Sequence, residues 1–147
     1  MNLLAYAGCL LGVETEWREP APLLRAGIYW PGARVMSLNN LRTHWIEDAP
    51  VVAITFYRAL YQAGNLEPVD AVIAALRQRD LNPLPVFVAS LKEALSAETV
   101  DSIFGDAPPA IILNSTGFAV SKPNGERTPS PLERPGVPVI QMIFAGG

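Results

Sequence analysis

The feature that most constrains the fold is a run of residues from Val51 to Tyr57 that is apolar at every position except Thr55. A strand reads as a continuous apolar run when it is buried on both faces, as the central strands of a parallel sheet are. Further apolar segments follow at residues 84–89, 110–113 and 137–144. We therefore expect four strands, and the segments between them indicate how the strands are connected.

The connections between the first three segments have the pattern of amphipathic helices. Pro68 is placed for a first helical turn, and an apolar stripe follows at Val69, Val72, Ile73 and Leu76. The order from residue 51 is strand, helix, strand, helix, strand, loop, strand. Such alternation predicts right-handed crossovers and a flavodoxin-like, doubly wound α/β fold. We expect a parallel sheet of about four strands in the order 2-1-3-4, with helices on both faces.

Local signals predict where the second helix begins and where the prolines of the second strand lie. Ser90 and Glu93 form an S-x-x-E capping box, so we expect the second helix to begin directly at the end of the second strand. The prolines of the 83–85 segment stand near the start of that strand, where a missing N–H is tolerated. Residues 58–65, between the first strand and the first helix, are interpreted as a polar connection.

The chain divides into two parts at the start of this regular pattern. Residues 1–49 are expected to hold an N-terminal helix and an irregular connecting segment, with a short helix from Ser37 to Trp45, and to belong to a neighbouring domain. Residues 50–147 are expected to form a truncated flavodoxin-like α/β domain. Since no helix follows the last strand and the chain opens within an apparent helix, we interpret the sequence as a fragment. Only 17% of the residues are charged, which indicates apolar surface for a neighbour.

Composition excludes several classes of function. A formal net charge of -3 with scattered Lys and Arg argues against nucleic acid as a partner. The apolar N-terminus is too short to span a bilayer, and the single cysteine, Cys9, excludes an internal disulfide, so we expect a cytoplasmic protein. His44 is the only histidine, so no His or Cys metal cluster can form within the chain, and neither G-x-x-x-x-G-K-[ST] nor G-x-G-x-x-G occurs. We expect no cofactor bound by this chain.

The candidate binding residues follow the carboxyl ends of the expected strands, where ligands bind in sheets of this kind. Arg58 and Asn65 come after the first strand, Lys92 after the second, and Asn114 and Thr116 after the third. Such cations and amides can meet a ligand that carries carboxylate groups. The alternative is purely structural: Arg58 pairs locally, Ser90 caps a helix and Asn114 holds its own loop.

Several segments together resemble the large subunit of aerobic cobaltochelatase, the CobN type. The matching segments are residues 25–32, 56–65, 68–76, 83–92, 113–119 and 138–141. The resemblance covers nearly the whole chain, and its ordered combination is specific, although proteins of that family are several times longer. It implies that this chain is part of an ATP-dependent metal chelatase, a ligase that forms nitrogen–metal bonds.

The resemblance implies a substrate and partners for the parent enzyme. That enzyme inserts cobalt into hydrogenobyrinic acid a,c-diamide in cobalamin biosynthesis, while an AAA+ ATPase subunit and its adaptor hydrolyse ATP. The family pattern often has a histidine at the position of Leu60, so the catalytic residues stay unknown and only Arg58 and Asn65 are carried over. We expect the fragment to contact the remaining domains of the large subunit and not to be catalytic by itself.

Three other interpretations stay open. The chain could be an independent flavodoxin-like module that binds a small anion, a purely structural interaction domain, or a relative of the magnesium chelatase large subunit. Flavin binding is disfavoured because the connection after the first strand lacks a hydroxyl-rich phosphate cradle.

Overall fold

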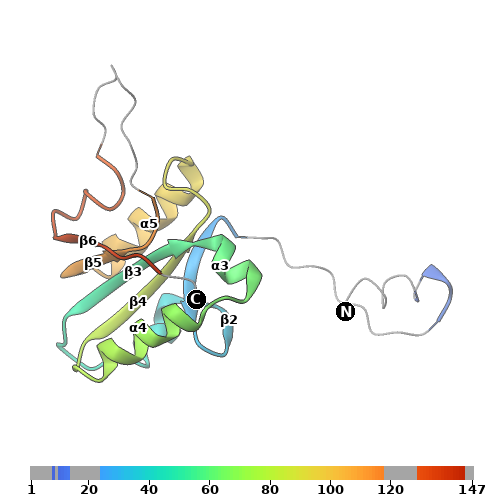
Figure 1. Ribbon diagram of the computed structural model, residues 1–147, viewed down its shortest axis with the longest axis horizontal. Coiled ribbons are helices and arrows are strands. Elements are labelled where there is room, and N and C mark those ends of the chain that lie inside the picture. The colour runs from blue at the N-terminus through green and yellow to red at the C-terminus, as the bar shows by residue number, and fades with distance from the viewer. Residues whose placement is uncertain (1–7, 9, 14–23, 118–128, 145–147) are drawn as a thin grey trace, which may run out of the picture.

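The computed structural model describes residues 8, 10–13, 24–117 and 129–144, and the strands and helices between residues 26 and 141 form one mixed α/β unit (Figure 1). Its sheet has six strands in the order β2-β1-β4-β3-β5-β6. The strands are β1 (Ala26–Trp30), β2 (Ala33–Met36), β3 (Val51–Tyr57), β4 (Asn82–Val88), β5 (Ile111–Asn114) and β6 (Val139–Gln141). The helices are α2 (Leu38–Arg42), α3 (Arg58–Ala63), α4 (Glu67–Arg77) and α5 (Ala94–Asp106).

The predicted parallel core of the sheet is confirmed. β3 pairs in parallel with β4 on one side and with β5 on the other, and β5 pairs in parallel with β6. In chain order this is the expected arrangement 2-1-3-4. The chain leaves β3 toward β4 and then returns across β3 to β5, so the direction of winding reverses between β3 and β5.

The expectation of about four strands was wrong, because the chain before residue 50 adds a hairpin to the same sheet. β1 pairs antiparallel with β4 and with β2. Pro31 and Gly32 connect the two hairpin strands, and Gly32 has a φ of 79°, which glycine adopts at little cost. Residues 26–36 are therefore regular structure, and the boundary expected near residue 50 does not coincide with an edge of the sheet.

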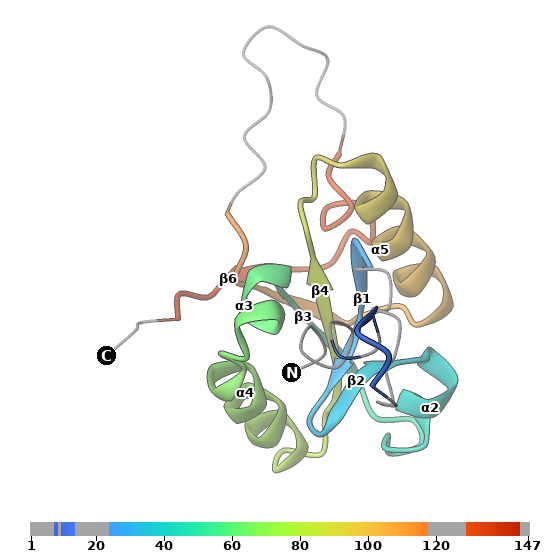
Figure 2. The same cartoon turned by 90° about the vertical axis from the view of Figure 1, so that its right-hand side faces the viewer.

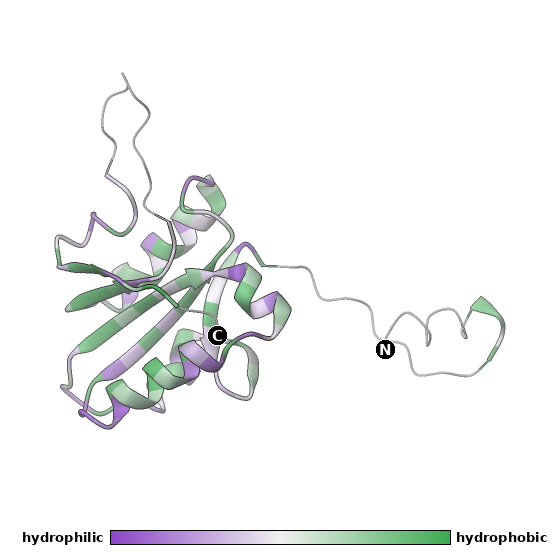
Figure 3. Ribbon diagram, in the orientation of Figure 1, coloured by the Kyte–Doolittle hydropathy of each residue, from purple (hydrophilic) through white to green (hydrophobic). Residues whose placement is uncertain are grey.

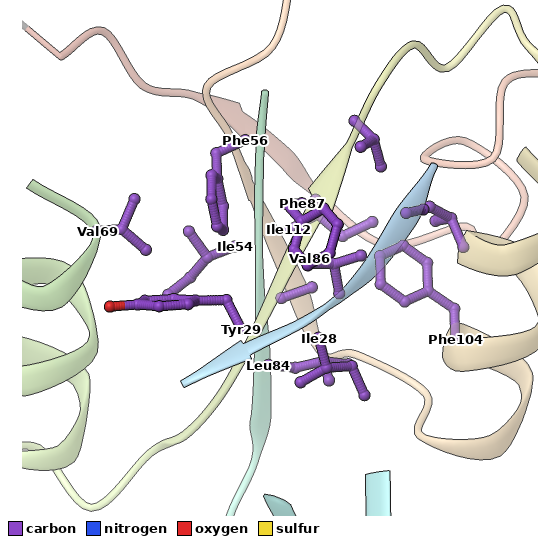
Figure 4. Packing of buried hydrophobic residues seen from close by; sticks show 14 of the residues in the cluster. Ile28, Tyr29, Ile54, Phe56, Val69, Leu84, Val86, Phe87, Phe104 and Ile112 are labelled. Atoms are coloured by element: carbon purple, nitrogen blue, oxygen red, sulfur yellow. The ribbon is translucent and has the colours of Figure 1, made fainter. Parts of the chain in front are cut away.

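Helices cover both faces of the sheet (Figure 2): α3 and α4 lie on one face and α5 on the other. The strands carry the apolar residues, whereas the helices are mixed (Figure 3). On the α4 face, Ile54 and Phe56 of β3 lie beside Val69, and all three are fully buried (Figure 4). On the other face, Val86 lies toward Phe104 of α5. The sheet is thus the middle layer of a three-layer core.

Two helix predictions are corrected. Residues 58–63, expected as a connection, form α3, which Gly64 ends in the left-handed conformation. α5 begins at Ala94 and not directly after β4, because the Ser90 hydroxyl accepts from the N–H of Lys92 and so closes a turn. The Glu93 carboxylate instead accepts from the hydroxyl of Ser96 and pairs with Arg25, at 3.0 Å.

Other local predictions are confirmed. α4 begins with Pro68 in its first turn, and a helix is present where one was expected from Ser37 to Trp45, although it is shorter: α2 has Ser37 as its N-cap and ends at Arg42. The two prolines lie early in β4, where β1 pairs only with residues 86–88. The N–H of Asn82 donates to the carbonyl of Pro50, so by alternation the nitrogens of Pro83 and Pro85 face away from β3. Neither proline therefore interrupts the β3–β4 ladder.

The predicted N-terminal helix, including Cys9, lies largely outside the described residues, as does the end of the chain after Phe144. Within the described part of the chain, no helix has the length and apolar character needed to cross a membrane.

Candidate functional site

The candidate residues gather at one edge of the sheet, where the parallel strands end. Arg58 follows β3, Lys92 comes shortly after β4, and Asn114 and Thr116 lie at the end of β5. Because β3, β4, β5 and β6 are parallel, their ends share an edge, which we call the carboxyl edge. Figure 1 shows α3 just beyond the arrowhead of β3 at this edge. The expected convergence of Arg58 and Asn114 on one edge is thus observed.

A buried amide stands at the centre of this edge. Asn114 is 2% exposed, and its Oδ1 accepts from the hydroxyls of Thr55 and Thr116, at 2.8 and 2.7 Å. The same oxygen accepts from the N–H of Thr116 at 3.0 Å. The Asn114 Nδ2 donates to the side chain of Gln141 at 2.9 Å and to the carbonyl of Thr116 at 3.1 Å. The polar atoms of this side chain are therefore engaged within the protein.

Gln141 extends the network to the last strand. Its Nε2 donates to the carbonyls of Thr116, at 2.9 Å, and Met142, at 3.3 Å, while the N–H of Met142 donates to the Asn114 carbonyl. We call Thr55, Asn114, Thr116 and Gln141 the amide network. Sequence reasoning missed Gln141, although a polar residue inside an apolar strand was an available signal.

Three cations lie on the other half of the edge. Arg58 donates a hydrogen bond to the carbonyl of Leu24 at 3.3 Å. Arg25, which follows Leu24 in the chain, forms an ion pair with Glu93. Lys92 is exposed and adjoins Glu93 in the chain. We call Arg25, Arg58 and Lys92 the cationic rim. Arg25 and Lys92 stay exposed, the Arg25 side chain to 54% despite the ion pair, whereas Arg58 is half-buried.

Arg25 was missed because the chain before residue 50 was interpreted as irregular. Since β1 runs antiparallel to β4, the residue before β1 lies at the carboxyl edge. Asn65 does not join the amide network. It follows the glycine that ends α3, its side chain is exposed, and its backbone N–H donates to the carbonyl of Leu60.

Tyr57 lies between the rim and the network and was also missed. Tyr57 is 41% exposed, and its hydroxyl accepts from the N–H of Gly117 at 2.8 Å. Tyr57 is the last residue of the apolar run that begins at Val51, so the sequence indicated only that it ends a buried strand.

The opposite, amino edge of the sheet carries two open clefts of about 360 and 370 Å³. His44 lines the first, but its ring stacks on Trp30 with centroids 4.8 Å apart, and the Arg77 guanidinium lies 5.8 Å from the same indole. Among the described residues, no group of three or more His, Cys, Asp or Glu side chains could hold a metal ion.

Chemically, the carboxyl edge is suited to binding anions. Arginine and lysine donors bind carboxylates by charge-assisted hydrogen bonds, and the buried amide network fixes the strand ends from which the rim projects. The rim and network contain no imidazole, and Glu93 beside them is paired with Arg25.

Comparisons with known proteins agree on one family. The family model described as CobN/Magnesium Chelatase matches residues 1–147. A protein of Sinorhizobium sp named aerobic cobaltochelatase subunit CobN is 43% identical over 97% of this chain, and one of Pseudomonas aeruginosa with the same name is 38% identical over 90%. The chain spans only 12% and 10% of those relatives.

A solved structure supports the fold. The chain described as the catalytic subunit of cobaltochelatase from Mycobacterium tuberculosis matches with a TM-score of 0.66 and 20% identity, over 97% of this chain and 12% of that one. From the family model and the curated relatives together, the chain belongs to the CobN/Magnesium Chelatase family.

Proposed function

We propose that this chain is a fragment of the large subunit of an aerobic cobaltochelatase. The parent enzyme inserts cobalt into hydrogenobyrinic acid a,c-diamide, a step of cobalamin biosynthesis in the cytoplasm. Two relatives named for cobaltochelatase support this reading, as does the eight-fold greater length implied by the 12% coverage of the first. ATP is hydrolysed on an AAA+ subunit that acts with an adaptor, in keeping with the missing phosphate-binding motif in this sequence.

We further propose that the carboxyl edge faces the corrin precursor. The observation that carries this proposal is the convergence of the cationic rim on the edge where parallel α/β sheets bind ligands. Arg58 and Lys92 bind substrate carboxylates, and exposed Asn65 adds an amide at the margin. Asn114 and Thr116 act indirectly, because their polar groups hold β5 and β6 in place.

The fragment itself is proposed to be non-catalytic. Metal insertion requires removal of two pyrrolic protons, which needs a base in an enclosed site. The rim offers cations, and the network offers amides and hydroxyls that are already engaged. The base therefore comes from the remaining domains of the large subunit. The order of the four parallel strands supports a flavodoxin-like classification of this unit.

The proposal is tested by cobalt insertion with the full-length large subunit and its partner subunits. We expect Arg58→Ala and Lys92→Ala each to raise KM by about tenfold, since a hydrogen bond to a charged group contributes roughly 1.5–3 kcal/mol. Arg77→Ala, at the amino edge, is the matched control and should leave KM unchanged. If all three variants change KM equally, or if none of them changes KM, the carboxyl edge does not bind the substrate.

The same assay separates the metal alternatives. The family description also names magnesium chelatase, so magnesium with a porphyrin is the second arm. Cobalt insertion without magnesium insertion supports the proposed function, and the reverse result contradicts it.

A further inference from the structure

The point where the winding of the sheet reverses lies between β3 and β5. In open α/β sheets, ligands bind outside the carboxyl ends of the strands at this switch point. Tyr57 is the last residue of β3, and Gly117 lies just beyond the end of β5. The hydrogen bond from the Gly117 N–H to the Tyr57 hydroxyl therefore spans the switch point.

Tyr57 is more exposed than the residues that precede it in β3. Residues 52–56 of β3 are buried, whereas Tyr57 is 41% exposed. Single exposed aromatic residues are common on protein surfaces. Tyr57 differs because its hydroxyl is tied to the backbone of a neighbouring strand end.

Gly117 approaches the phenol closely. A Cβ added at Gly117 would lie 3.0 Å from the Tyr57 hydroxyl, so a larger residue there would push the ring. The hydrogen bond and this close approach restrict the movement of the ring, while part of it stays open to a ligand. Holding a contact group in place before binding reduces the entropy lost on association.

We propose that Tyr57 is a specificity-determining contact for a flat, conjugated macrocycle that carries carboxylates. Its ring packs against the macrocycle, while Arg58 and Lys92 of the rim meet the carboxylates. Aromatic rings stack favourably on other π systems, and the rim alone does not distinguish a macrocycle from any small polyanion. This inference rests on the proposed function, because it names the part of the same edge that selects the ring.

The test is equilibrium binding of the metal-free corrin precursor to the full-length large subunit, followed by its absorbance without metal or ATP. Tyr57→Leu removes the ring and should weaken binding about tenfold, the effect of losing one aromatic contact with its buried area. Tyr57→Phe keeps the ring and should stay within about threefold of the wild type. Gly117→Ala displaces the ring and should fall between the two.

Val35→Ala is the matched control, since Val35 is similarly exposed, at 44%, but lies on β2, at the far end of the strand order. Urea unfolding of each variant checks that the fold is kept. If wild-type protein binds the precursor and Tyr57→Leu binds it equally well, the inference is wrong while the proposed function stands. If Tyr57→Phe weakens binding as much as Tyr57→Leu, the ring by itself contributes no affinity, and the ring proposal is overturned. If the wild type neither binds the precursor nor inserts cobalt, the proposed function fails.

Discussion

Asn114 is the residue whose surroundings say most about its role. A buried carboxamide that both accepts and donates inside the protein has little capacity left for a ligand. The structural alternative considered for this residue, that it holds its own loop, agrees with these contacts. The sequence could predict the position of Asn114 at the end of a strand. It could not predict the contacts, because Gln141 lies 27 residues away in the chain.

Replacing Asn114 by Asp should destabilise the protein by about 1–3 kcal/mol, the typical cost of leaving a buried polar group unsatisfied. Aspartate is nearly isosteric but lacks the N–H groups that donate to Gln141 and to the Thr116 carbonyl. Urea unfolding measures the change. Asn65→Asp, at an exposed position, is the control and should alter the free energy of unfolding by less than about 0.5 kcal/mol. Equal stabilities of the two variants would contradict the role given to the network.

Gly27 gives a second residue-scale prediction. A Cβ at this position would lie 2.8 Å from Cζ of Phe87, whose ring stacks on Tyr61 with centroids 4.9 Å apart. Gly27→Ala should therefore destabilise by about 1–3 kcal/mol through overpacking. Gly105→Ala, inside α5 with open space around it, should instead be neutral or stabilising by up to about 1 kcal/mol. Thermal unfolding of both variants checks the opposite signs.

At the scale of elements, the sequence predicted the four parallel strands and α4, and it failed for the β1–β2 hairpin and for α3. β3 is apolar except at Thr55, β4 is apolar after Asn82, and α4 has a clear apolar stripe. The β1–β2 hairpin was missed, although Pro31 and Gly32 mark the turn between its two strands. α3 was missed because it starts directly at the end of a strand with no side-chain cap, although Gly64 marked its end.

The start of α5 shows why a motif alone is ambiguous. Ser90 and Glu93 satisfy the capping-box spacing, yet both side chains have other partners in the folded protein. The decisive partner, Arg25, is distant in the sequence. Because of these tertiary contacts, α5 begins later in the chain than the capping-box motif predicts.

The contact between β1 and α4 makes a prediction about pH. The Tyr29 hydroxyl donates to the Asp70 carboxylate at 2.7 Å, and burial together with this carboxylate raises the pKa of Tyr29. The folded protein then holds the phenolic proton more tightly than the unfolded chain, whose tyrosines titrate near about pH 10. Stability from this group is full below that pH and decreases as the pH rises above it.

Tyr29→Phe should therefore be less stable than the wild type at neutral pH and lose less stability between about pH 9 and 11. Urea unfolding at a series of pH values measures how the free energy of unfolding of each protein changes with pH. Parallel pH profiles for the two proteins would mean that Tyr29 is not responsible for the alkaline loss.

At the scale of the whole molecule, the strands at the β6 end of the sheet are less buried than the central strands. Along one apolar row, Ile54 is fully buried, Leu113 is half-buried and Ile140 is 49% exposed. Parallel sheets are normally covered on both faces, so the β6 end of the sheet is apolar surface without a cover among the described residues. The low share of charged residues agrees with this arrangement.

We expect the 147-residue chain to self-associate through this surface as its concentration rises. Ile140→Lys should reduce the association at little cost in stability, because the side chain is half exposed. Sedimentation velocity over a range of concentrations measures the effect. Unchanged association in the variant would place the contact surface elsewhere.

The most direct test of the central claim is amide hydrogen exchange of the full-length large subunit with and without the corrin precursor. If the carboxyl edge faces the substrate, exchange should slow in residues 57–60, 89–93 and 114–117. Residues 46–50 and 78–81 at the amino edge should be unaffected. Slowing confined to the amino edge, or absent from both edges although the precursor is bound, would contradict the account.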